Sequence, residues 1–243
     1  MGLLINNLYM YSDQPQKKLK KTIFTLGFDT YAPEVVKLTL PFLKRFADKI
    51  NADLKIITER KFPGYPVMYE KFQIYELGKD NDWNYYIDPD CLVHPDLFDI
   101  TEVLSEDTVL NFGVDFAGNR FNYDNFFRRD GRNISSTSFL TVSSYLCHEI
   151  WEPLNDMTDK EALKNIKSIH REEMIGHTDG RGIDDYVMSR NIAKYGIKFK
   201  TFVNLLNEIG RGGDEYFYYD FSVQEKDRAE KIREKLKNWN YIK

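Results

Sequence analysis

Residues 83–90 read Trp-Asn-Tyr-Tyr-Ile-Asp-Pro-Asp, and this stretch gives the strongest indication of the fold. Its aromatic and β-branched part predicts a buried strand, because such side chains pack well on a pleated surface. Pro89 cannot donate a backbone hydrogen bond to a neighbouring strand, so the strand should end at Ile87. Asp88 and Asp90 then lie in the loop that follows. Two carboxylates there suit Mg²⁺ or Mn²⁺ bound together with substrate phosphates. An ordinary turn is the alternative, since Asp-Pro-Asp is also common turn chemistry.

The segments before this stretch alternate between strand and helix patterns. We expect strands over 22–26 and 53–58, the second of them buried. Between them, apolar residues at three- and four-residue steps predict a helix over 33–50. Met68, Phe72 and Tyr75 share one face of a short helix expected before the strand that ends at Ile87. Strand, helix, strand, helix, strand is the order of parallel βαβ units. The expected fold class is therefore α/β, with a mixed, mainly parallel, Rossmann-like sheet flanked by helices.

Residues 1–243 show no repeat and no convincing linker, and are expected to form a single domain. In its second half we expect strands over 108–116, 138–143 and 198–203, and helices over 145–154, 183–195 and 222–239. In parallel sheets, ligands bind beyond the carboxyl ends of the strands. Gly27, Glu59 and Asp88 fall at such ends, which predicts a functional rim there.

The charge, cysteine content and motifs of the chain argue against several classes of protein. A net charge of −4 argues against a general nucleic-acid binder, which normally carries a basic face. The two cysteines make no disulfide framework, and no apolar run approaches a membrane span, so a soluble, cytoplasmic protein is expected. The sequence also lacks a phosphate-binding P-loop, a dinucleotide fingerprint and a nucleophile elbow.

Residues 22–100 resemble the nucleotide-binding half of a GT-A glycosyltransferase. They also resemble small viral and bacterial sugar transferases. The matching stretches are Thr25-Leu-Gly27, Leu40-Pro-Phe-Leu-Lys44, Ala52-Asp-Leu-Lys-Ile-Ile-Thr-Glu59, Met68-Tyr-Glu-Lys71-Phe72 and Tyr85-Tyr-Ile-Asp88-Pro-Asp90. The resemblance implies a metal-dependent enzyme that moves a sugar from a nucleoside-diphosphate donor to a hydroxyl of a saccharide or glycoconjugate. Residues 101–243 would form its acceptor and catalytic half.

The resemblance also implies roles for particular residues on the donor side. Mn²⁺ or Mg²⁺ on Asp88 and Asp90 would stabilise the departing diphosphate. Many members add a late histidine to the metal, but no histidine follows His177. Asp220 is the expected substitute, and weak or absent metal dependence is the alternative. The other expected donor contacts are Thr25, Gly27 and Glu59 near the nucleoside, Lys71 at the phosphates or ribose, and Asn133 and Ser135 at the sugar. A solvated helix face is the alternative for Lys71, and a polar turn is the alternative for Asn133 and Ser135.

Asp184 and Asp185, at the start of the helix over 183–195, resemble the acidic pair that GT-A enzymes turn toward the acceptor. An inverting enzyme needs a carboxylate base for the acceptor hydroxyl, and either residue could supply it. Plain stabilisation of the helix N-terminus is the alternative. A retaining reaction also stays open. The alternative functions are a nucleotidyltransferase on a similar sheet and a non-catalytic nucleotide- or sugar-binding protein of the same fold.

Overall fold

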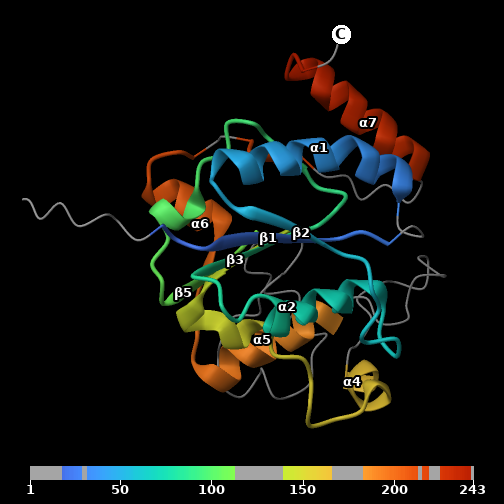
Figure 1. The fold of residues 1–243 in the computed structure, drawn as a ribbon, viewed down its shortest axis with the longest axis vertical. Helices are drawn as coiled ribbons and strands as arrows, with labels where there is room; N and C mark the ends of the chain where they lie inside the picture. Colours follow the sequence, from blue (N-terminus) through green and yellow to red (C-terminus); the bar gives the residue numbers. More distant parts are fainter. Residues whose placement is uncertain are drawn as a thin grey trace, which may run out of the picture.

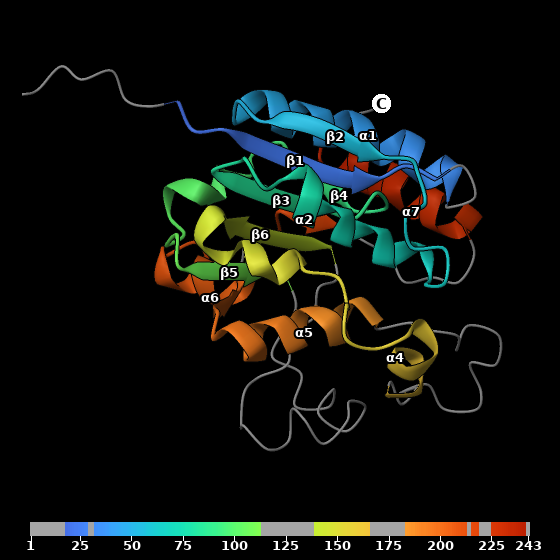
Figure 2. The same cartoon turned by 60° about the horizontal axis from the view of Figure 1, so that its bottom comes forward.

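A six-stranded sheet organises the protein, with the strand order β2-β1-β3-β6-β5-β7 (Figure 2). The computed structural model describes residues 18–28, 32–112, 139–165, 183–212, 215–218 and 225–241. The strands are β1 (Lys21–Leu26), β2 (Asp53–Ile57), β3 (Trp83–Ile87), β5 (Thr108–Asn111), β6 (Leu140–Ser144) and β7 (Lys198–Thr201). Only β6 runs against its neighbours in this sheet. The predicted mixed, mainly parallel sheet is therefore confirmed.

Helices cover both faces of this sheet (Figure 1). One face carries α1 (Pro33–Lys49) and α6 (Phe202–Glu208), and α7 (Glu225–Asn238) packs on α1. The other face carries the 3₁₀ helices η1 (Val67–Gln73) and η4 (Tyr145–Trp151) and the α-helices α2 (Ile74–Leu77) and α5 (Ile183–Tyr195). The remaining elements are β4 (Leu92–Val93), η2 (Ile100–Glu102), α4 (Asp159–Asn165) and β8 (Phe217–Tyr218), with β4 and β8 paired in a small second sheet.

The alternation of side chains along β3 divides the core into two layers. Trp83, Tyr85 and Ile87 pack toward α1, whereas Tyr86 packs toward α5. Successive side chains on a strand point to opposite faces, so the residue after Ile87 continues on the α5 side. This alternation sets the direction in which Asp88 leaves the sheet.

The predicted elements agree well with the observed ones, with three differences. The helix predicted over 145–154 is the 3₁₀ segment η4, which ends at Trp151 and is interrupted at Cys147. The helix predicted over 183–195 is α5, and the one predicted over 33–50 is α1. The buried strand predicted over 53–58 is instead an edge strand with exposed residues, because nothing pairs with its outer side in this sheet. The strand predicted over 198–203 ends at Thr201, whose side chain accepts a hydrogen bond from Asn204 N and begins α6. The start of the helix predicted from Ser222 lies outside the described residues.

Asp99 ties the end of the first half of the chain to the sheet. Its carboxylate accepts hydrogen bonds from Tyr85 Oη at 2.9 Å and Thr101 Oγ1 at 2.8 Å, and it pairs with Lys21 Nζ. Burial raises the pKa of Asp99, but the hydrogen bonds from Lys21, Thr101 and Tyr85 outweigh it and hold that pKa below its ordinary 3.8.

Asp99 should therefore make part of the stability dependent on acid pH. A carboxyl whose folded-state pKa is lowered stabilises the fold above its unfolded pKa and loses that contribution as pH falls through the folded value. We expect the free energy of unfolding to decline between about pH 5 and pH 2, and the decline to be shallower in Asp99→Asn. Urea titrations at several pH values measure both slopes. Equal slopes for the two proteins would contradict this role.

Candidate functional site

Asp88 is fixed at the carboxyl end of β3 by three hydrogen bonds. Its backbone N–H donates to the Phe139 carbonyl at 3.0 Å, which extends the pairing of β3 and β6 by one residue. Its carboxylate accepts from Phe139 N at 3.0 Å and from Tyr86 Oη at 2.6 Å. The strand end and the adjacent tyrosine thus give this carboxylate one orientation, on the α5 side of the sheet.

Asp90 is held on the other side of the sheet. The chain turns after Asp88, whose carbonyl accepts from Cys91 N at 3.1 Å, and the Thr39 hydroxyl of α1 donates to the Pro89 carbonyl. Arg228 of α7 donates from Nη1 to Asp90 Oδ2 at 2.7 Å. The two carboxylates of the Asp-Pro-Asp stretch therefore have partners on different elements.

Lys71 joins Asp88 to the acidic start of α5. Its Nζ lies 2.7 Å from Asp184 Oδ2 and 4.4 Å from the centre of the Tyr86 ring. Burial lowers the pKa of Lys71, but the negative charges of Asp184, Asp88 and Asp185 outweigh that effect and raise it, so the ammonium stays charged. Its side chain is only 1% exposed, so the solvated helix face considered for it is wrong.

Four predicted site residues are thus brought together as one group, which we call the Lys71 cluster: Lys71, Asp88, Asp184 and Asp185. They come from η1, the end of β3 and the first turn of α5, which are far apart in the sequence. The cluster holds three carboxylates and one ammonium at the carboxyl rim of the sheet. Such an arrangement can accept a proton and can hold a charged or hydroxyl-bearing substrate.

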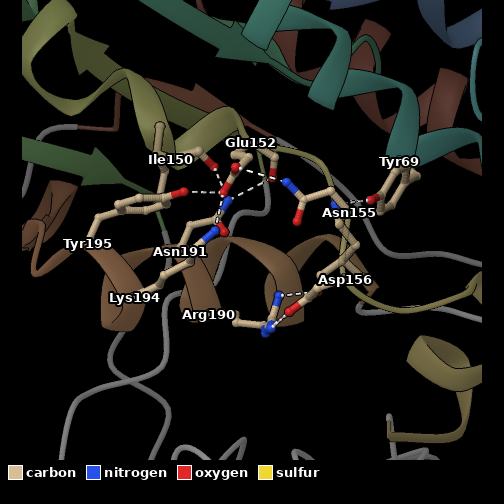
Figure 3. Close-up of polar contacts among 10 residues, drawn as sticks. Tyr69, Ile150, Glu152, Asn155, Asp156, Arg190, Asn191, Lys194 and Tyr195 are labelled. Atoms are coloured by element: carbon tan, nitrogen blue, oxygen red, sulfur yellow. Dashed lines mark hydrogen bonds and ion pairs between the residues drawn. The ribbon is translucent and has the colours of Figure 1, made fainter.

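The position of α5 is set by polar contacts along its length (Figure 3). Asn191 donates from Nδ2 to the carbonyls of Ile150 and Glu152, at 3.1 and 2.8 Å. Lys194 Nζ lies 2.7 Å from Glu152 Oε2, which also accepts from Tyr195 Oη.

Arg190 forms a two-pronged ion pair with Asp156 in the same network, with Nη1 3.0 Å from Oδ1 (Figure 3). Tyr69, close to Lys71 in η1, adds a link, because its hydroxyl accepts from Leu154 N at 2.8 Å. The segment after η4 is therefore tied to both η1 and α5. These contacts fix the helix whose first turn carries Asp184 and Asp185.

Glu70 carries a buried carboxylate that sequence reasoning did not single out. Glu70 Oε1 accepts from Arg60 Nε at 2.7 Å and Phe62 N at 3.0 Å, while Oε2 accepts from Lys61 N and Gln73 Nε2, both at 2.8 Å. Glu70 is completely buried. It therefore organises the loop that follows β2 at the same rim as the Lys71 cluster.

Replacing Glu70 by Gln should destabilise the protein by about 1–3 kcal/mol, because an amide NH₂ would then face donors instead of accepting from them. Thermal or urea unfolding measures this loss. Glu76→Gln is the matched control, since Glu76 is exposed and pairs only loosely with Lys79 at 3.8 Å. A loss no larger than that of the control would show that the Glu70 contacts are dispensable.

Thr25, Gly27 and Glu59, which were predicted near a nucleoside, lie at or near the carboxyl ends of β1 and β2. Each of the three has a different environment. Thr25 is buried in β1, and its Oγ1 has no hydrogen-bond partner among the described residues. Gly27 N donates to the Ile57 carbonyl at 2.9 Å, and a Cβ on Gly27 would come within 2.3 Å of Ile56 Cγ2. Gly27 therefore serves the close approach of β1 and β2. Glu59 is exposed, and its carbonyl accepts from Gln73 Nε2 at 2.7 Å.

Comparison with solved structures identifies this architecture. The galactosyltransferase LgtC, solved with donor and acceptor sugar analogues, superposes with a TM-score of 0.51 at 12% identity, over 88% of this chain and 94% of that one. The chain has the GT-A fold. A glycosyltransferase involved in glycosylation of the PBCV-1 major capsid aligns at TM-score 0.47 and 10% identity, over 88% of this chain and 99% of that one.

A third structure with this likeness is the Drosophila β1,4-galactosyltransferase 7 in complex with manganese, UDP-Gal and xylobiose. It aligns at TM-score 0.44 and 13% identity, over 86% of this chain and 74% of that one. No family model matches the chain, and no curated protein matches it. Within the described ranges, no helix has the length and apolar character needed to cross a membrane.

The metal site that the GT-A resemblance implied finds little support in the side chains around Asp88 and Asp90. Among the described residues, no three His, Cys, Asp or Glu side chains gather closely enough to hold a metal ion. Asp90 pairs with Arg228, and Asp88 accepts two hydrogen bonds. The hydrogen-bond donors around the two carboxylates do not fit the metal site with two carboxylate ligands that the resemblance implied. The predicted third ligand, Asp220, lies outside the described residues, as do Asn133 and Ser135.

Proposed function

We propose that the protein is a glycosyltransferase that moves a sugar from a nucleoside-diphosphate donor to a hydroxyl of a saccharide or glycoconjugate. The observation that carries this proposal is the Lys71 cluster, which places the carboxylates of Asp88 and Asp184 together at the carboxyl rim of a GT-A sheet. Ligands of such sheets bind at this rim. The structural likeness to LgtC, a galactosyltransferase solved with donor and acceptor sugar analogues, supports the same class.

Asp185 is our proposed catalytic base. The Asp184 carboxylate is already bound by Lys71 at 2.7 Å, which makes it the positioning member of the pair. Successive side chains on a helix point about 100° apart, so Asp185 is directed differently from Asp184. In an inverting reaction, Asp185 takes the proton of the acceptor hydroxyl while that oxygen bonds to the anomeric carbon. The bond from that carbon to the diphosphate breaks, and its electron pair leaves with the diphosphate.

The donor is proposed to lie along the rim formed by the ends of β1, β2 and β3. Thr25, Gly27 and Glu59 lie at or near these strand ends and are proposed to flank the nucleoside. Asn133 and Ser135 remain the proposed contacts of the sugar. A Mn²⁺ or Mg²⁺ ion on Asp88, Asp90 and Asp220 stays a prediction of the sequence, and no step of this reaction depends on it.

Calorimetric titration with UDP, GDP and dTDP, each in Mn²⁺, tests the donor side of this proposal. We expect one of the three to bind, and its base identifies the donor class. Asp88→Asn should weaken that binding and lower the unfolding midpoint only modestly, because the amide oxygen can still accept from Phe139 N and Lys71 keeps Asp184 as its direct partner. Failure of all three nucleotides to bind would contradict a nucleoside-diphosphate donor.

A further inference from the structure

We propose that Arg228 binds the diphosphate of the donor, and that Asp90 holds this arginine in place, so that nucleoside diphosphate binds without a divalent cation. The proposal rests on the proposed function, since it concerns the same donor. In this proposal, the positive charge beside the diphosphate comes from a guanidinium instead of a metal ion bound to Asp88 and Asp90.

The ion pair between Arg228 and Asp90 is largely shielded from water. Nη1 lies 2.7 Å from Asp90 Oδ2, and the two side chains are 17% and 13% exposed. Arg228 Nε is buried and has no hydrogen-bond partner among the described residues. A buried N–H donor normally has an acceptor, so the unmet Nε shows that the contact with Asp90 does not use the full hydrogen-bonding capacity of this guanidinium.

The position of Arg228 follows from the packing of α7. Ala229, Ile232 and Leu236 form the buried stripe of this helix and pack against α1 and Leu92 of β4. Arg228 directly precedes Ala229 in the chain and reaches across to the loop after β3. Because the helix is anchored by its apolar stripe, the guanidinium is held at the rim and loses little freedom when an anion binds.

The ion pair with Arg228 keeps Asp90 from adding to the negative charge at the rim. The Lys71 cluster contains three carboxylates and one ammonium, and Asp90 would add another negative charge two residues beyond Asp88. An unpaired Asp90 carboxylate would repel a diphosphate lying against the loop after β3, and the guanidinium removes this nearest repulsion. The guanidinium neutralises Asp90 and still offers further N–H donors, whose planar fork matches phosphate oxygens.

Titrations of UDP, GDP and dTDP in EDTA test this proposal, with the same titrations in Mn²⁺ beside them. The wild type should bind one nucleotide in EDTA, and Arg228→Gln should weaken that binding at least tenfold. Arg228→Lys keeps the charge but not the fork, and should give an intermediate affinity. Arg233→Gln is the matched control, because Arg233 is an exposed arginine of the same helix that pairs only loosely with Glu34, at 3.8 Å.

The outcomes separate this proposal from the proposed function. Binding that requires Mn²⁺ would overturn the role of Arg228 and leave the nucleotide-sugar donor standing. Unchanged affinity of a folded Arg228→Gln in EDTA would also overturn it. If that variant does not fold, as judged by circular dichroism, wild-type affinity of Arg228→Lys would overturn it instead. No binding of any nucleotide in either condition would contradict the proposed function itself.

Discussion

Replacing Lys71 by Met will lower the free energy of unfolding by about 3–5 kcal/mol, as expected when one member of a buried ion pair is removed. The ammonium is buried beside Asp184, and the charges of Asp88 and Asp185 also act on it. Without it, these carboxylates are left close together with no cation between them. Urea unfolding at neutral pH measures the loss.

Two further variants make this result specific to the Lys71 cluster. Lys79→Met removes an exposed lysine and should change the free energy of unfolding by less than about 0.5 kcal/mol. The double variant Lys71→Met with Asp184→Asn should recover part of the stability lost in Lys71→Met, because one of the uncompensated charges is gone. If Lys71→Met were as stable as the Lys79 variant, the ion pair would not be a structural element of the site.

Replacing Asp185 by Asn will lower kcat by about 10²–10⁴-fold, the range typical for loss of a positioned general base. The amide is nearly the same size but cannot take the acceptor proton. The affinity for the nucleotide should stay close to that of the wild type, because Asp185 is assigned to the acceptor side. Steady-state kinetics with the matching nucleotide sugar, alongside calorimetry with the nucleotide, separate the two effects.

Asp96→Asn is the control for this kinetic test, because Asp96 is an exposed carboxylate on a loop beyond β4, whose contact is with His94. Its kcat should equal that of the wild type. Asp184→Asn should reduce both stability and turnover, because it releases Lys71. A normal kcat in Asp185→Asn together with a large loss in Asp184→Asn would exchange the roles assigned to the two residues.

The local patterns in the sequence were sufficient for the sheet and for the place of the rim. The strand before Asp88 and the helix starting at Ile183 were predicted because hydrophobic periodicity reports which face of an element is buried. Helix α6 was missed, because its first residues continue the apolar pattern of β7. Only the capping contact from Thr201 marks the boundary.

The partners of the site residues could not be predicted, because they depend on long-range contacts. Lys71 lies on a short helical segment, where its spacing fits either a solvated or a buried position. It is buried because Asp184, 113 residues later, supplies its counter-charge. Asp90 has its partner in Arg228, 138 residues later. A pattern of two carboxylates after a strand predicts a metal equally well whether or not such an arginine is present.

Consumption of UDP-, GDP- and dTDP-sugars tests the central claim most directly, by following release of the nucleoside diphosphate from each donor. Water can stand in for an acceptor, so the assay needs no knowledge of the natural one. We expect the protein to release the nucleoside diphosphate from one class of donor, and Asp185→Asn to do so far more slowly. No release above background from any donor, with or without Mn²⁺, would contradict sugar transfer as the function of this site.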